Sequence, residues 1–123
     1  MPTWTFADPA PDDEPVQLRD WFVFELPGGA RHADGNEYRH GRESRVSSAI
    51  KGEIDLVGAS FITSSGRHYK LAGRPGMTLD VDYVLNKWLA RMGVDRDAIV
   101  DVSRALLNEL VEAANSTPRP AGL

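Results

Sequence analysis

The change from strand-like to helix-like sequence near residue 80 most constrains the fold. Between residues 81 and 92, apolar side chains recur at the i, i+3, i+4, i+7, i+8 and i+11 positions of one helical face. Asp80 can cap the start of this helix, and Gly93 suits the left-handed position after its end. Because strand patterns come first and helices last, the chain is expected to fold as an α+β domain.

A second amphipathic pattern predicts a helix over residues 95–115, with Asp95 as its N-cap. Its main apolar stripe indicates the side that packs on the domain. That stripe consists of Ile99, Val102, Leu106 and Leu110. A further stripe beside it indicates either deep burial of the helix or an extra interface. The candidate interface residues are Val100, Leu107 and Val111.

The strand patterns lie in residues 20–73 and predict a small antiparallel sheet of four or five strands. Helices 80–92 and 95–115 are expected to form a two-helix C-terminal unit that covers one face of this sheet. From the N-terminus, the sequence predicts an extended, acidic, proline-rich leader over 1–18, a single domain over 19–115, and a flexible tail over 116–123.

The stretch "FITSSGRHYKL" predicts a β-hairpin with Ser65 and Gly66 at its turn. Strand alternation then gives two faces. We expect Ile62, Tyr69 and Leu71 on the core side and Phe61, Thr63, His68 and Lys70 on the other. Upstream, Gly52 interrupts a strand pattern and indicates a bulge or bend.

Composition excludes several classes of protein. With 123 residues and a 41% hydrophobic fraction, the chain is long enough to bury a core, and no apolar run is long enough to span a membrane. The first residues lack the basic and apolar regions of a secretory signal, so a cytoplasmic location is expected. The net charge of −4 argues against general affinity for nucleic acid, although residues 21–79 carry eight bases against six acids.

Catalytic motifs are not recognisable in the sequence. No G-x-S-x-G elbow and no phosphate-binding loop occurs, and there is no cysteine. Neither an enzymatic activity nor a cofactor is therefore expected. A weak metal cluster falls within nine residues, but its spacing matches no established site, and a solvated polar loop is the preferred interpretation. Its members are His32, Asp34, Glu37 and His40.

Basic and hydroxyl side chains near the predicted hairpin form the main candidate binding site. If neighbouring hairpins lie side by side, these residues gather on one edge of the sheet and hold an acidic protein surface or a nucleic-acid strand. A solvated face with local salt bridges is the alternative. The candidate residues are Arg45, Ser47, Ser48, Ser64, Arg67, His68 and Arg74.

Residues 20–94 resemble small uncharacterised bacterial and phage proteins. The shared features are an R-V-S-S-x-I segment at residues 45–50, a T-x-S-G-R-x-Y-x-L hairpin at residues 63–71, and a following helix that contains tryptophan, here Trp88. The resemblance implies a compact domain and brings no established activity with it.

These observations favour a non-catalytic protein-interaction or regulatory module with a protein partner, or a homodimer formed through the extra stripe of the second helix. Small acidic chains of this kind also occur among mobile-element inhibitors of host defence systems, such as anti-CRISPR proteins, and that role is a further expectation from class alone. The alternative is a nucleic-acid-binding regulator that uses the arginine-rich hairpin edge.

Overall fold

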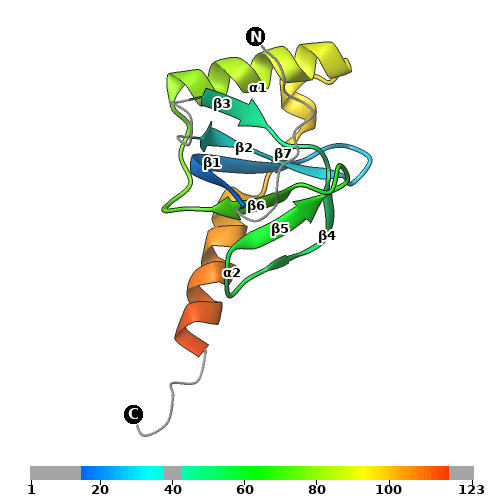
Figure 1. Cartoon of the computed structure of the whole chain (residues 1–123). Helices are drawn as coiled ribbons and strands as arrows, with labels where there is room; N and C mark the ends of the chain where they lie inside the picture. Colours follow the sequence, from blue (N-terminus) through cyan, green and yellow to red (C-terminus); the bar gives the residue numbers. More distant parts are fainter. Residues whose placement is uncertain (1–14, 38–42, 117–123) are drawn as a thin grey trace, which may run out of the picture.

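The protein consists of a mixed sheet and two C-terminal helices, which confirms the α+β class (Figure 1). The sheet has seven strands and not the four or five predicted. The structure is a computed structural model that describes residues 15–37 and 43–116. The strands are β1 (Val16–Glu25), β2 (Arg31–Glu37), β3 (Glu43–Val46), β4 (Ile50–Asp55), β5 (Ser60–Thr63), β6 (His68–Leu71) and β7 (Val100–Asp101). The helices are α1 (Leu79–Met92), the short 3₁₀ helix η1 (Arg96–Ala98) and α2 (Ser103–Ser116).

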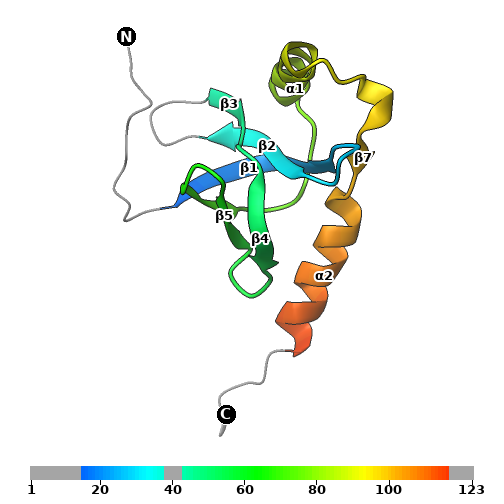
Figure 2. The same ribbon diagram turned by 90° about the vertical axis from the view of Figure 1, so that its right-hand side faces the viewer.

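The long strand β1 joins two parts of the sheet, whose order is β3-β2-β1-β6-β5-β4. Residues 16–18 pair in parallel with β6, so the sheet is mixed and not purely antiparallel as predicted. The later residues of β1 pair antiparallel with β2 and β7. A bulge between Arg19 and Phe22, with Asp20 at φ 51°, bends the strand between the part that pairs with β6 and the part that pairs with β2 and β7. Figure 2 shows the β4–β5 hairpin on one side of β1 and β2–β3 on the other.

This pairing corrects the predicted leader, because residues 16–18 form a strand whose Val16 and Leu18 are buried in the core. The rest of the predicted leader, up to residue 14, and the tail from residue 117 lie outside the described residues. The predicted irregularity at Gly52 is confirmed: its φ is +72°, and the register of β4 against β5 shifts between Lys51 and Asp55.

The β5–β6 hairpin has a longer loop than predicted. The Thr63 N–H donates to the Arg67 carbonyl oxygen at 3.0 Å, so residues 64–66 form the loop, and not Ser65 and Gly66 alone. Gly66 has a φ of +86°, which suits the left-handed position at the end of a three-residue hairpin loop. One extra loop residue moves the strand pairing by one position.

That shift reverses the predicted faces of β5. Phe61 pairs with Tyr69, and the two rings stack at 5.4 Å between centroids. Phe61 and Thr63 are buried, whereas Ile62 is 42% exposed, so the prediction for these three residues was wrong. On β6 the predicted faces are confirmed for Tyr69 and Leu71 inside and for His68 and Lys70 outside.

Helix α1 begins one residue earlier than predicted, and Thr78 rather than Asp80 is its N-cap. The Thr78 hydroxyl accepts from the Val81 N–H at 3.2 Å. Gly93 ends the helix in the left-handed conformation, as predicted. The buried face of α1, formed by Val81, Leu85 and Leu89, lies toward the sheet. Leu85 and Leu89 pack with Phe24 of β1 in one apolar cluster.

The predicted helix over residues 95–115 is wrong in its first eight residues. Asp95 precedes η1 without a side-chain capping bond, and Val100 and Asp101 form β7 against Glu25 and Phe24. Strand pairing with β1 satisfies backbone groups that a helix would otherwise pair within itself, and this long-range contact overrides the local helical pattern. Helix α2 therefore starts at Ser103.

The two helices lie on opposite faces of the β1–β2 pair and do not form a unit on one face as predicted. On one side, α1 packs over β2 and β3. On the other side, Leu106 of α2 joins the core cluster of Trp21, Val23 and Ala33. Figure 1 shows α1 across one end of the sheet and α2 running away from it. Among the helices of residues 15–37 and 43–116, none is long and apolar enough to cross a membrane.

Candidate functional site

The tip of the β5–β6 hairpin lies against the segment that joins β3 to β4. The Ser64 N–H donates to the Ala49 carbonyl oxygen at 2.8 Å, which holds the hairpin tip beside Ser48 and its neighbours. The positive charges of Arg45 and Arg67 both lower the pKa of the Tyr69 hydroxyl. Residues from the two predicted segments therefore do meet at one end of the sheet.

Charges at this end of the sheet are partly compensated within the protein. Arg45 Nη1 donates to Glu37 Oε1 at 2.8 Å, and the Glu37 side chain is only 9% exposed. Burial raises the pKa of Tyr69, while the positive charges of Arg45 and Arg67 oppose that shift. The Tyr69 hydroxyl is therefore neutral at pH 7. Arg45 is bonded to Glu37, so the exposed candidate side chains at this end are those of Ser64 and His68, whereas Arg74 is exposed beyond the far end of β6.

The serines at this edge serve the backbone. Ser47 is 2% exposed, and its hydroxyl accepts from the Ala33 N–H at 3.0 Å and donates to the Ser48 carbonyl oxygen at 2.7 Å. The Ser47 hydroxyl is thus both an acceptor and a donor, and it joins β2 to the turn after β3. Ser64 is exposed in the hairpin loop. Of the predicted binding residues, Ser47 is thus part of the packing between strands.

The predicted metal cluster is divided by strand alternation. His32 and Asp34 lie on one face of β2 and Glu37 lies on the other, next to Arg45. His40 lies outside the described residues. His32 Nδ1 is bonded to the Ser47 carbonyl oxygen at 2.9 Å, and its ring packs against Phe24 and Trp88. Within the described ranges, no group of three or more potential metal-binding side chains converges.

A row of buried polar side chains on β2 faces α1, and we call it the buried polar row. It consists of His32, Asp34 and Asn36. At one end the His32 ring lies 4.7 Å from the Trp88 ring of α1. At the other end the Asn36 amide donates to Asp20 Oδ2 at 3.2 Å and to the Thr78 hydroxyl at 3.4 Å. Both ends of the row are therefore satisfied by specific partners.

Asp34, in the middle of the buried polar row, differs from its neighbours. It is 0% exposed, and neither carboxylate oxygen has a hydrogen-bond partner. Across the sheet it is flanked by Phe22 of β1 and Val46 of β3. Burial raises the pKa of Asp34 to about 8, although the nearby Gly35 amide and the charge of Arg96 lower it. Asp34 is therefore a neutral carboxylic acid at pH 7.

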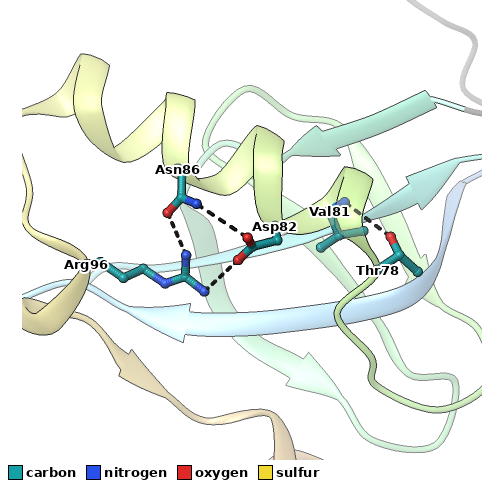
Figure 3. Close-up of polar contacts among 5 residues, drawn as sticks. All are labelled: Thr78, Val81, Asp82, Asn86 and Arg96. Carbon is teal, nitrogen blue, oxygen red and sulfur yellow. Dashed lines mark hydrogen bonds and ion pairs between the residues drawn. The ribbon is translucent and has the colours of Figure 1, made fainter.

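Asp82, Asn86 and Arg96 form a polar group (Figure 3), and the charges of Arg96 and Asp82 act on Asp34. The Arg96 guanidinium contacts Asp82 Oδ1 at 3.0 Å and donates to Asn86 Oδ1, and Asn86 donates to Asp82 Oδ2 at 3.5 Å. This group ties η1 to α1. Because the Arg96 and Asp82 side chains are each 40% exposed, water weakens their attraction.

The sequence indicated Asp34 only as a weak metal ligand and Tyr69 only as a core residue, and it indicated no role for Asn36. The segment "RHADGNE" has no large apolar side chain, and its polar residues indicated a loop. One signal is present in it: Ala33 and Gly35 alternate with larger polar residues at the period of a strand. A Cβ on Gly35 would lie 3.0 Å from Leu18 Cβ, so β1 approaches β2 too closely there for a larger residue at position 35.

The predicted interface residues are placed on two different elements. Val100 is 57% exposed on β7, and Val111 is 51% exposed on α2. Leu107 is partly buried against the core cluster that includes Leu106. Val100 therefore does not continue the stripe of α2, whereas Leu107 and Val111 lie on one side of it.

Comparison with protein-family models, with curated proteins and with solved structures gave no match to this chain. Functional proposals therefore rest on the geometry of these residues alone.

Proposed function

We propose that the protein is a non-catalytic protein-interaction module, and that α2 binds the α2 helix of a second copy of the chain. The supporting observation is the incomplete burial of this helix. From Leu107 to Asn115, every residue of α2 is partly or fully exposed. In both views of the structure, the last turns of α2 extend beyond the strands (Figures 1 and 2).

Apolar side chains continue along this outer part of α2. Leu107, Leu110, Val111 and Ala114 follow the i, i+3, i+4, i+7 spacing of one helical face. Leu107 and Leu110 pack only partly against the core of the domain. An apolar stripe on a helix that leaves its own domain is typical of a helix that packs against another helix.

The charges of α2 favour an antiparallel second copy. Arg104 lies in its first turn, Glu109 lies at its middle and Glu112 lies in its second half, and no basic residue lies in its last turn. The acids thus lie toward the negative end of the helix dipole, where they are unfavourable. An antiparallel partner would place its Arg104 and the positive end of its helix beside Glu112.

Analytical ultracentrifugation over a range of concentrations tests this proposal. We expect a monomer–dimer equilibrium in the natural chain and a shift toward monomer in Val111→Glu. Leu79→Glu is the matched control, because it introduces the same charge at an apolar residue that is 88% exposed on α1. Arg104→Glu should weaken the dimer, and adding Glu112→Arg should restore it. A natural chain that is monomeric at every concentration would contradict the proposal.

Binding of nucleic acid by the hairpin edge is the second candidate function. It is favoured by the contact of the hairpin tip with residue 49 and by the placement of Arg45 and Arg67 beside Tyr69. Fluorescence anisotropy with single- and double-stranded DNA and RNA tests it. The candidate requires binding that weakens steeply with salt and that is lost in Arg67→Glu with Arg74→Glu.

Inhibition of a host defence system is one biological use of a protein-interaction module. It is supported by the small size of the chain, 123 residues, and by its net charge of −4. Titration of the purified protein into a reconstituted CRISPR nuclease reaction tests it, and unchanged cleavage at saturating protein would exclude that target.

A further inference from the structure

Asp34 occupies an enclosed position between α1 and the sheet. Its neighbours on the same face of β2 both contact α1 or its cap, His32 through Trp88 and Asn36 through Thr78. Asp34 lies between them, has no exposed surface, and has two oxygens without hydrogen-bond partners. In folded proteins most buried polar groups are paired, so this carboxyl group calls for a specific explanation.

The charged groups that act on Asp34 are Asp82 on α1 and Arg96 on η1. Its polar neighbours on the same face of β2 are His32 and Asn36, and Asn36 is bonded to Asp20 of β1 and Ser44 of β3. Arg96 is the cation whose charge acts on Asp34, and it is already held by Asp82 and Asn86. Asp82 adds a like charge that opposes ionisation of Asp34.

We propose that Asp34 is a proton-operated latch: α1 stays packed on β2 and β3 while Asp34 carries its proton, and loss of that proton releases α1 from the sheet. The latch is independent of self-association through α2, since the two helices lie on opposite faces of the β1–β2 pair.

The physical reason is the difference between the closed and the open state. With α1 packed, an ionised Asp34 would be a buried charge that the Gly35 amide and the Arg96 charge compensate incompletely, and such a charge is strongly disfavoured. With α1 released, water solvates the carboxylate. Burial accordingly raises the pKa of Asp34 to about 8 in the closed state, against about 3.9 for an exposed aspartate.

The direction of the pH effect follows from these two values. Below about pH 4 both states carry the proton, and pH has no effect on opening. Between about pH 4 and 8 only the open state is ionised, so the opening equilibrium constant rises about tenfold per pH unit. Above about pH 8 both states are ionised and the constant levels off. Opening would expose the apolar cluster of Phe24, Leu85 and Leu89.

Amide hydrogen exchange between pH 5 and 9, corrected for the intrinsic exchange rate, tests the latch on the full chain. We expect the opening constants of amides at Leu85 and Leu89 to rise about tenfold per unit up to about pH 8 and then to level off. Amides in the outer part of α2 that exchange by local opening, such as that of Leu107, should not follow this slope. A flat profile for α1, or the same slope in these α2 amides, would overturn the proposal.

Two variants identify the group that is responsible for the pH dependence of α1 opening. Asp34→Asn keeps the shape of the side chain and removes its ionisation, so the slope should disappear. Asp82→Asn, the matched control on α1, should shift the profile along the pH axis and keep the slope. Persistence of the slope in Asp34→Asn would overturn the proposal. If Asp34→Asn does not fold, the profile of the natural chain decides alone, because a constant opening equilibrium between pH 5 and 8 contradicts the latch.

Discussion

Helices α1 and α2 contact the sheet through surfaces of different character. The base of α2 packs in the apolar cluster of Trp21, Val23 and Leu106. Its one buried polar group, Ser103, is fully used, since the Val23 N–H donates to the Ser103 hydroxyl at 2.8 Å. By contrast, α1 covers the buried polar row, in which the two oxygens of Asp34 have no partner.

The α2 side therefore contributes stability, whereas the stability of the α1 side depends on pH. Burial of apolar area on the α2 side contributes stability that does not depend on a titrating group. On the α1 side, the buried carboxyl group of Asp34 lowers the free energy of unfolding at any pH at which the same group is ionised in the unfolded chain. A residue that costs stability without a local benefit is often retained for function. We therefore expect changes on the two sides to differ in sign and in pH dependence.

The largest loss of stability is predicted for Leu106→Ala on the α2 side. Leu106 is 6% exposed within the core cluster, so its truncation should lower the free energy of unfolding by about 2–5 kcal/mol. Urea denaturation measures this loss. Leu79→Ala, at an 88% exposed position, is the control and should change stability by no more than about 0.5 kcal/mol. A loss below about 1 kcal/mol for Leu106→Ala would show that α2 is not anchored there.

On the α1 side, Asp34→Asn is predicted to raise stability at neutral pH. Because burial raises the pKa of Asp34 to about 8, the natural chain loses stability as pH rises from about 4 to 8, and the variant avoids this loss. The expected gain at pH 7 is on the order of 2–4 kcal/mol, less the cost of burying the amide.

Urea denaturation at pH 4 and pH 7 tests this gain, which should nearly vanish at pH 4. Asp97→Asn, at an exposed position on η1, is the matched control. A gain of equal size at both pH values would mean that packing of the amide, and not ionisation of Asp34, is responsible.

Ser103→Ala is predicted to have an intermediate effect. The substitution leaves the buried Val23 N–H without its partner, and such a group costs about 1–3 kcal/mol. Thermal unfolding at pH 5 and pH 8 measures the effect, which should be the same at both pH values because no titrating group is involved. A strong pH dependence would contradict the proposed contrast between the two sides.

The smallest effect on stability is predicted for Arg96→Gln. Its ion pair with Asp82 is partly exposed, so its removal should cost about 0.2–1 kcal/mol, and less at high salt. The same change removes a positive charge that lowers the pKa of Asp34. The titration of Asp34 should therefore move to higher pH while stability hardly changes, and an unchanged titration would show that Arg96 does not act on Asp34.

Sequence patterns predicted the parts of the fold that depend on local periodicity. The buried face of α1 and its end at Gly93 follow directly from the spacing of apolar residues. The start of α2 was wrong because Val100 pairs with Glu25, a contact that no local pattern encodes. The faces of β5 were wrong because one additional loop residue, Ser64, changes the register of the whole hairpin.

The candidate site was only partly predictable for the same reason. The sequence left open whether the hairpin tip meets the segment after Arg45, and the Ser64–Ala49 bond shows that the tip contacts this segment. The burial and protonation of Asp34, however, depend on α1, whose residues lie more than 40 positions later in the chain. A single strand pattern cannot show which of its polar faces a later helix will cover.

¹³C NMR of the Asp34 carboxyl carbon as a function of pH shows whether α1 holds this group protonated at neutral pH. We expect a titration midpoint near the value of about 8 that burial gives this group. A midpoint below about 5, close to that of an exposed aspartate, would contradict both the buried neutral acid and the latch built on it.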